Sequence, residues 1–208
     1  MLPKYLSKII FLLFVLIFIS SITNAQIKIG LNGGVNFASH TISGTSSDIT
    51  LMRKTGFTIG AIAEYPISNN FSVRLNAGYI QRGGKNKILS LGNKENKFFY
   101  EYIELSPYIT YKVINSKIFA KIIGGLSFGH LINADVNSNG NNFSIKDNLY
   151  LFNITSNFGL EIEIPILAKT SLILNGIYSL GLKNISRYGI ALKTNDINLN
   201  IGFLYGLL

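Results

Sequence analysis

Long stretches of this chain alternate between apolar and polar residues, and this alternation limits the possible folds more than any other feature. The segment SLILNGIYSLGL at 171–182 is one example. A period of two places successive side chains on opposite faces of an extended strand. The pattern recurs in stretches much longer than a mean strand of roughly 5–6 residues. We expect eight strands, at Ile27–Ala38, Lys54–Pro66, Phe71–Arg82, Phe98–Val113, Ile118–His130, Tyr150–Ile164, Thr170–Leu182 and Asp196–Leu207.

The connections between these stretches alternate in length. The short ones are Ile67–Asn70, Ile114–Lys117 and Pro165–Lys169, and they contain Asn, Ser and Pro, which favour tight turns. The long ones are Ser39–Arg53, Gly83–Lys97, Leu131–Leu149 and Lys183–Asn195. Long loops at one end and tight turns at the other are typical of outer-membrane barrels. The pattern therefore predicts an all-β fold, an eight-stranded antiparallel up-and-down transmembrane β-barrel with both termini at the short-turn end.

The aromatic residues indicate which face of the strands meets lipid. In the last predicted strand, INLNIGFLY, Asn198 and Asn200 share one face and the apolar residues share the other. Aromatic residues gather near both ends of the apolar faces, as expected at the two interfaces of a membrane. The group toward the long loops is Phe37, Phe57, Tyr79, Phe99, Phe128 and Phe152, and the group toward the short turns is Tyr65, Phe71, Tyr111, Phe203 and Tyr205. We expect the apolar faces to point outward; a soluble lipocalin-like barrel, with these faces inward, is the alternative.

The polar faces carry a small, nearly balanced set of charges. An eight-stranded barrel has an interior just wide enough for its own side chains, which argues against an open nutrient pore. Because a lone buried charge is costly, we expect these residues to pair inside the barrel as a structural network. An acid/base pair or a proton path is the functional alternative. The predicted lumen network is Lys28, Glu64, Arg74, Glu104, Lys121, Glu161 and Glu163.

Two residues disturb the regular pattern. Pro107 interrupts the fourth predicted strand and lacks an N–H donor, which predicts a bulge or an edge. A bulge there would exchange the faces of Tyr108, Tyr111 and Lys112. Phe119 takes the inward phase of the fifth strand, which indicates either a register slip or a partly apolar floor of the barrel.

The N-terminus has the features of a secretory signal peptide. Lys4 and Lys8 precede an unbroken apolar run at 9–19, and small residues end at Ala25. We expect a signal peptide at 1–25 and the barrel domain at 26–208. Removal of the two lysines lowers the formal charge from the +9 of the whole chain to +7, and the absence of Cys excludes disulfides and thiolate metal sites.

Basic residues are concentrated in two of the long loops, and this indicates a contact surface. At the outer surface they would be suited to the phosphates of lipopolysaccharide; a merely solvated loop is the alternative. Dispersed basic residues in an exported chain argue against nucleic acid as a partner. The candidate contacts are Arg82, Lys85, Lys87, Lys94, Lys97, Lys183, Arg187 and Lys193.

Nothing in the sequence defines a catalytic centre. His40 and His130 lie near the long-loop end, with Ser39, Ser127 and Asp135 nearby in sequence, but no spacing defines a triad. Two histidines without cysteine also argue against a zinc site. We expect no enzyme activity, no catalytic or cofactor-binding residues, no cofactor and no metal. An envelope lipid-modifying barrel enzyme that uses one of the histidines is the alternative.

Four stretches resemble the small PorT-like outer-membrane β-barrel family of Gram-negative bacteria, which is related in shape to the OmpA and OmpX barrels. They are IKIGLNGGVNFA, YIELSPYITYKV, IYSLGLKNI and INLNIGFLYGLL. The resemblance implies an outer-membrane location, no shared catalytic residues and, for some members, an accessory role in secretion. Such barrels usually end in an aromatic residue that the barrel-insertion machinery reads, whereas this chain ends Gly206-Leu207-Leu208. The partners we expect are outer-membrane lipid and lipopolysaccharide, the insertion machinery and another envelope protein, with the chain itself a monomer.

Overall fold

The computed structural model describes residues 26–43, 49–88, 94–138, 140–188 and 191–207. The predicted signal peptide at 1–25 lies outside the described residues. No helix in the described part of the chain is long and apolar enough to cross a membrane.

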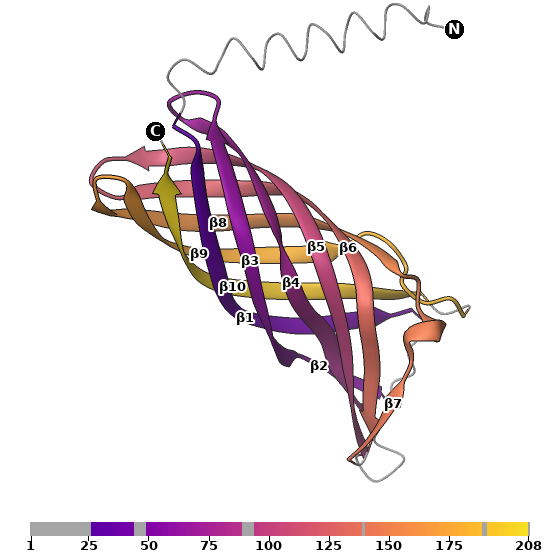
Figure 1. Cartoon of the computed structure of the whole chain (residues 1–208). Helices are drawn as coiled ribbons and strands as arrows, with labels where there is room; N and C mark the ends of the chain where they lie inside the picture. The colour runs from indigo at the N-terminus through magenta and orange to yellow at the C-terminus, as the bar shows by residue number, and fades with distance from the viewer. Residues whose placement is uncertain (1–25, 44–48, 89–93, 139, 189–190, 208) are drawn as a thin grey trace, which may run out of the picture.

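The strands form one closed antiparallel barrel (Figure 1). Eight long strands close the ring in the order β4-β3-β1-β10-β9-β8-β6-β5, and β4 pairs with β5. Two short strands extend this sheet: β2 pairs with β4 and β7 with β6. The prediction of an eight-stranded up-and-down barrel is therefore confirmed. The bounds are β1 (Lys28–Ile42), β2 (Ile49–Met52), β3 (Lys54–Pro66), β4 (Phe71–Ile88), β5 (Lys94–Asn115), β6 (Phe119–Ser138), β7 (Asn141–Ser144), the 3-10 helix η2 (Lys146–Asn148), β8 (Phe152–Leu167), β9 (Thr170–Gly181) and β10 (Leu192–Gly206).

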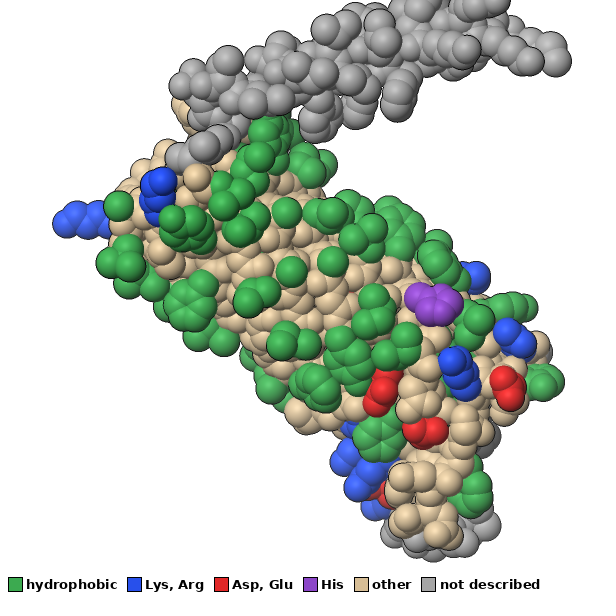
Figure 2. All heavy atoms as spheres, in the orientation of Figure 1, with side chains coloured by type: hydrophobic (Ala, Val, Ile, Leu, Met, Phe, Trp, Pro, Cys, Tyr) green, Lys and Arg blue, Asp and Glu red, His purple; other side chains and the backbone are tan. Residues whose placement is uncertain are grey.

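The apolar faces point outward along the barrel wall. On β8, Phe158 and Leu160 are each 63% exposed, whereas Asn157 and Glu161, which flank this stretch, are buried. Figure 2 shows hydrophobic side chains spread over the side of the barrel, with the charged side chains of this view toward its two ends. The polar faces line the interior, so the lipocalin-like alternative is wrong.

Three strands run well beyond their predicted ends at the long-loop side. β4 continues to Ile88, β5 begins at Lys94 and β6 reaches Ser138. With β2 and β7, the segments 83–88, 94–97 and 131–138 form a projecting sheet that we call the crown (Figure 1). The predicted loop Gly83–Lys97 is therefore largely a paired hairpin. Its alternation is weak because both faces of a sheet above the membrane can meet water.

Pro107 causes no bulge in the pairing of β5 with β4. The β4–β5 register runs without a shift from the Phe71–Tyr111 pair to the end of the hairpin, and Pro107 points outward. Tyr108 is buried and Tyr111 is exposed, so the faces are not exchanged. On the other side, the β5–β6 pairing is interrupted at Ser106 and Pro107 without a shift in register, and the register shifts lie at 101–102 and 112–114.

The floor of the barrel is partly apolar, as one of the two readings of Phe119 predicts. The Phe119 ring lies on the inner side of β6, with Lys112 Nζ 5.3 Å from its centroid. A separate apolar cluster of Ile62, Ile173 and Leu204 is also fully enclosed by the barrel.

Candidate functional site: the sealed interior and the outer crown

Arg74 is the centre of an ionic cluster in the half of the barrel near the short turns. Its guanidinium donates Nη1–H and Nη2–H to the two carboxylate oxygens of Glu161, at 2.5 and 2.6 Å, and Nε–H to Glu64 at 2.8 Å. All three side chains are essentially excluded from solvent. Such bidentate Arg–carboxylate pairs combine charge with planar geometry, and charge-assisted bonds are about twice as strong as neutral ones.

Lys121 and Lys28 complete this cluster. Lys121 Nζ lies 2.8 Å from Glu64 and 2.6 Å from Glu163, and Lys28 Nζ donates to Glu163 at 2.6 Å. Three bases therefore meet three acids contributed by β1, β3, β4, β6 and β8. The charges are balanced, and the cluster ties together strands far apart in the sequence.

A second ionic cluster lies nearer the long loops. Arg82 donates to Glu104 through Nε–H at 3.1 Å and Nη2–H at 2.8 Å, and its second partner is Asp196. Arg82 is 1% exposed, so the prediction that it is a basic contact at the outer surface is wrong. The strand extends past it, and its inward phase, shared with Arg74, places it in the lumen.

Asp196 is an interior charge that the sequence analysis missed. Asp196 is fully buried. Because it is the first residue of the last predicted strand, the pattern alone did not indicate whether its side chain points inward or outward. Its spacing of two from Asn198 is the signal that could have found it, because residues separated by two share a face. All seven residues of the predicted lumen network do lie in the interior, in the two clusters described.

The space between the two clusters is narrow and polar. A cavity of about 60 Å³ lies there, lined by side chains that include Asn76, Asn198 and Ser179. The hydroxyls of Ser106 and Ser127 are 2.6 Å apart beside it. A volume of this size has room for a few water molecules and nothing larger.

An apolar plug fills the long-loop mouth of the barrel. Leu149 and Ile185, from two different connections, pack with Tyr100, Tyr102 and Leu131 in one buried cluster. Burying a side chain of this size stabilises by roughly 1.5–3 kcal/mol. Within the described residues, the interior is thus blocked by this plug and by the two ionic clusters.

The two histidines lie in different surroundings, and in the described structure neither forms a hydrogen bond with the serine and acidic residues that the enzyme alternative would require. His40 is buried at the mouth, with Nε2 2.7 Å from Asn86 Oδ1, and burial lowers its pKa. His130 lies on the exposed side of β6. Among the residues that the structure describes, no hydrogen bond links either histidine to Ser39, Ser127 or Asp135, and no group of three acidic, His or Cys residues could hold a metal.

The remaining basic candidates fall into two groups. Lys85, Lys87, Lys94 and Lys97 lie on the paired strands of the crown hairpin rather than in a loop. Glu95 lies 3.6 Å from both Lys85 and Lys97 and compensates part of their charge.

The second basic group lies beside β8 and β10. Lys183 and Arg187 lie over one aromatic ring, that of Tyr150. Lys193 is exposed on β10.

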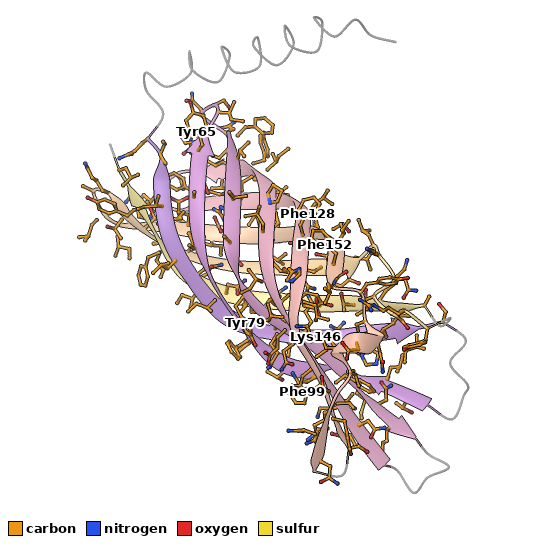
Figure 3. All side chains as sticks on the ribbon, turned by 45° about the vertical axis from the view of Figure 1, so that its right-hand side comes forward. Tyr65, Tyr79, Phe99, Phe128, Lys146 and Phe152 are labelled. Atoms are coloured by element: carbon orange, nitrogen blue, oxygen red, sulfur yellow. The ribbon has the colours of Figure 1, made fainter. Side chains whose placement is uncertain are left out.

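Aromatic side chains lie at both ends of the lipid-facing surface. Phe57 and Tyr79 are 5.0 Å apart toward the long loops, and Phe71 and Tyr111 are 4.7 Å apart toward the short turns. In Figure 3, Tyr65 lies at the short-turn end, and Phe128 and Phe152 lie nearer the long-loop end. An apolar wall between two aromatic girdles, around a polar and filled lumen, defines a small transmembrane barrel of the outer membrane.

Comparisons with known proteins lead to the same class. Residues 23–187 match the outer membrane protein beta-barrel domain family, and the chain belongs to that family. It resides in the outer membrane. No curated protein matches the sequence significantly.

Solved barrels share the fold at low sequence identity. Neisserial surface protein A is 13% identical with a TM-score of 0.51, covering 88% of this chain and 99% of that one. OprG from Pseudomonas aeruginosa is 10% identical with a TM-score of 0.55, covering 88% and 98%. The outer membrane protease OmpT from Escherichia coli is 8% identical with a TM-score of 0.51, covering 88% and 97%. At these identities the similarity shows a shared fold only. The protease activity in the name of OmpT is a property of that protein and is not transferred to this chain.

Proposed function

We propose that this chain is a non-enzymatic structural or interaction protein of the outer membrane, with the crown and its neighbouring loops as the contact surface. The sealed interior carries this proposal. Two buried ionic clusters and the apolar plug leave no described path for a solute, whereas the crown presents exposed side chains such as Phe143 and Thr50. Binding at the outer surface is therefore the role best supported by the geometry.

The partners in this proposal are those that the location supplies. They are outer-membrane lipid and lipopolysaccharide around the barrel, another envelope protein at the crown and the barrel-insertion machinery during assembly, with the chain itself monomeric. A kinship with PorT-like barrels inside the family is also a proposal, based on the order of the four stretches quoted above. No residue of the described structure favours the secretion role that this kinship implies, and we do not propose it.

A crosslinking experiment tests the contact surface. A photoreactive amino acid is placed at Phe143 on β7 or Thr50 on β2, and at Ile118 in a short turn as the matched exposed control. In intact cells, we expect discrete adducts with lipopolysaccharide or an envelope protein at the crown positions and none of these at Ile118. The absence of adducts at both crown positions would contradict an interaction role. Ion conduction by the wild-type protein in planar bilayers would contradict the sealed interior.

A further inference from the structure

Two cations converge on one aromatic ring at the long-loop end of the barrel. Lys183 Nζ lies 5.3 Å from the centroid of the Tyr150 ring, and Arg187 Cζ lies 5.9 Å from it. Both distances are within the range of a cation–π contact. All three side chains are exposed, so the group is open to a ligand.

The backbone around this group is held by contacts between two loops. Tyr150 N–H donates to Ile185 O at 2.8 Å, and Arg187 N–H donates to Asn148 O at 3.0 Å. The buried side chains of Leu149 and Ile185 anchor both segments in the plug. The arrangement of the two cations is therefore built into the fold and does not need a ligand to form.

Neither cation has an anionic partner within the described part of the chain. No carboxylate there forms an ion pair with Lys183 or Arg187, in contrast to Lys85 and Lys97 of the crown, which share Glu95. Two like charges around one ring repel each other, and the ring quadrupole offsets this only in part. An anion between them would remove the repulsion.

The position of this group relative to the membrane indicates where such an anion would come from. Tyr150 lies two residues beyond Phe152, which belongs to the aromatic group toward the long loops and is exposed on the outer side. β8 begins at Phe152, so Tyr150 lies just beyond its end on the long-loop side. Leu182, directly before Lys183, is likewise exposed among the outward apolar residues. The group thus lies where the apolar band ends and lipid headgroups begin.

We propose that Tyr150, Lys183 and Arg187 form a binding site for a phosphate group of the lipid anchor of lipopolysaccharide. The Arg187 fork suits two phosphate oxygens, Lys183 adds a point charge and the Tyr150 ring holds both side chains toward the ligand. The proposal rests on the proposed function, in which lipopolysaccharide is one partner, and names one site for it.

Native mass spectrometry of the mature protein in detergent tests the site. The probes are diphosphorylated lipid A, the same lipid after removal of its phosphates, and inorganic phosphate. The test variant is K183Q/R187Q, and the matched control is K117Q/K169Q, which removes two exposed lysines at the short-turn end. The heat-dependent gel mobility of each variant shows whether its barrel is folded.

We expect the wild type and the control to retain diphosphorylated lipid A, and K183Q/R187Q to bind it about tenfold more weakly or worse, since a hydrogen bond to a charged group contributes roughly 1.5–3 kcal/mol. Equal binding by the folded K183Q/R187Q variant would overturn the site. If the wild type binds the dephosphorylated lipid as well as the diphosphorylated one, the site does not recognise a phosphate group. If it retains inorganic phosphate as well as diphosphorylated lipid A, the site is not specific for a lipid. Because the crosslinking positions on β2 and β7 lie outside this group, each proposal can fail while the other holds.

Discussion

Replacing Arg74 by Met tests whether the ionic cluster centred on Arg74 holds the barrel closed. Met keeps much of the side-chain volume but removes the charge and every hydrogen bond that Arg74 donates to Glu64 and Glu161. These two carboxylates are 2% and 0% exposed, so they cannot recover the lost partner from bulk water. Lys121 remains near both, at 2.8 and 3.6 Å, but it also serves Glu163.

The expected loss is about 3–5 kcal/mol of unfolding free energy, the usual result of removing one partner of a buried ion pair. The double variant R74M/E64Q leaves two bases and two acids in the cluster and restores its charge balance. We therefore expect it to recover about half of the loss or more. A recovery of that kind separates uncompensated charge from the packing change common to both variants.

Urea unfolding in detergent or lipid vesicles measures this, with the folded fraction followed by gel mobility without boiling. R74M should unfold at a lower urea concentration than the wild type, with R74M/E64Q between them. If the unfolding free energy of R74M is within about 0.5 kcal/mol of that of the wild type, pairing of the buried charges does not stabilise the barrel, and the prediction is refuted. An R74M/E64Q variant less stable than R74M would show that geometry, rather than charge balance, governs the cluster.

Three further predictions concern other parts of the molecule. L160K should cost about 2–4 kcal/mol, or prevent insertion, because Leu160 is exposed on the lipid-facing wall; unaltered stability in vesicles would contradict the lipid-facing assignment. G83A should destabilise the crown hairpin by about 1–3 kcal/mol, because Gly83 has a φ of 135°, whereas G124A, with open space around the added methyl, should change little; limited proteolysis compares the two, and equal cleavage would argue against strain at Gly83. Because burial lowers the pKa of His40, which lies beyond the aromatic girdle, the unfolded state binds more protons and stability should fall as the pH drops below about 6.5. The urea midpoint of H40Q should fall less than that of the wild type between pH 7.5 and 5, and identical pH profiles would refute a contribution from His40.

The barrel wall could be predicted from the sequence because lipid and lumen make opposite demands on neighbouring positions. Each strand residue inside the membrane faces either hydrocarbon or a polar interior, so every membrane-spanning strand alternates between apolar and polar residues. The same constraint predicted the inward positions of Arg74 and Glu161. Above the membrane both faces of a sheet meet water, the alternation weakens, and the crown hairpin was predicted as a loop.

The sequence by itself determined the eight long strands, the outward apolar faces and the inward positions of seven charged residues, since these depend on the local period of two. Only the tertiary structure decided which charges meet. Arg82 pairs with Asp196 because β4 and β10 face each other across a closed barrel, and no local pattern encodes that distance. The plug of Leu149 and Ile185 and the two cations over Tyr150 also depend on tertiary contacts, between the loops that flank the paired strands β8 and β9.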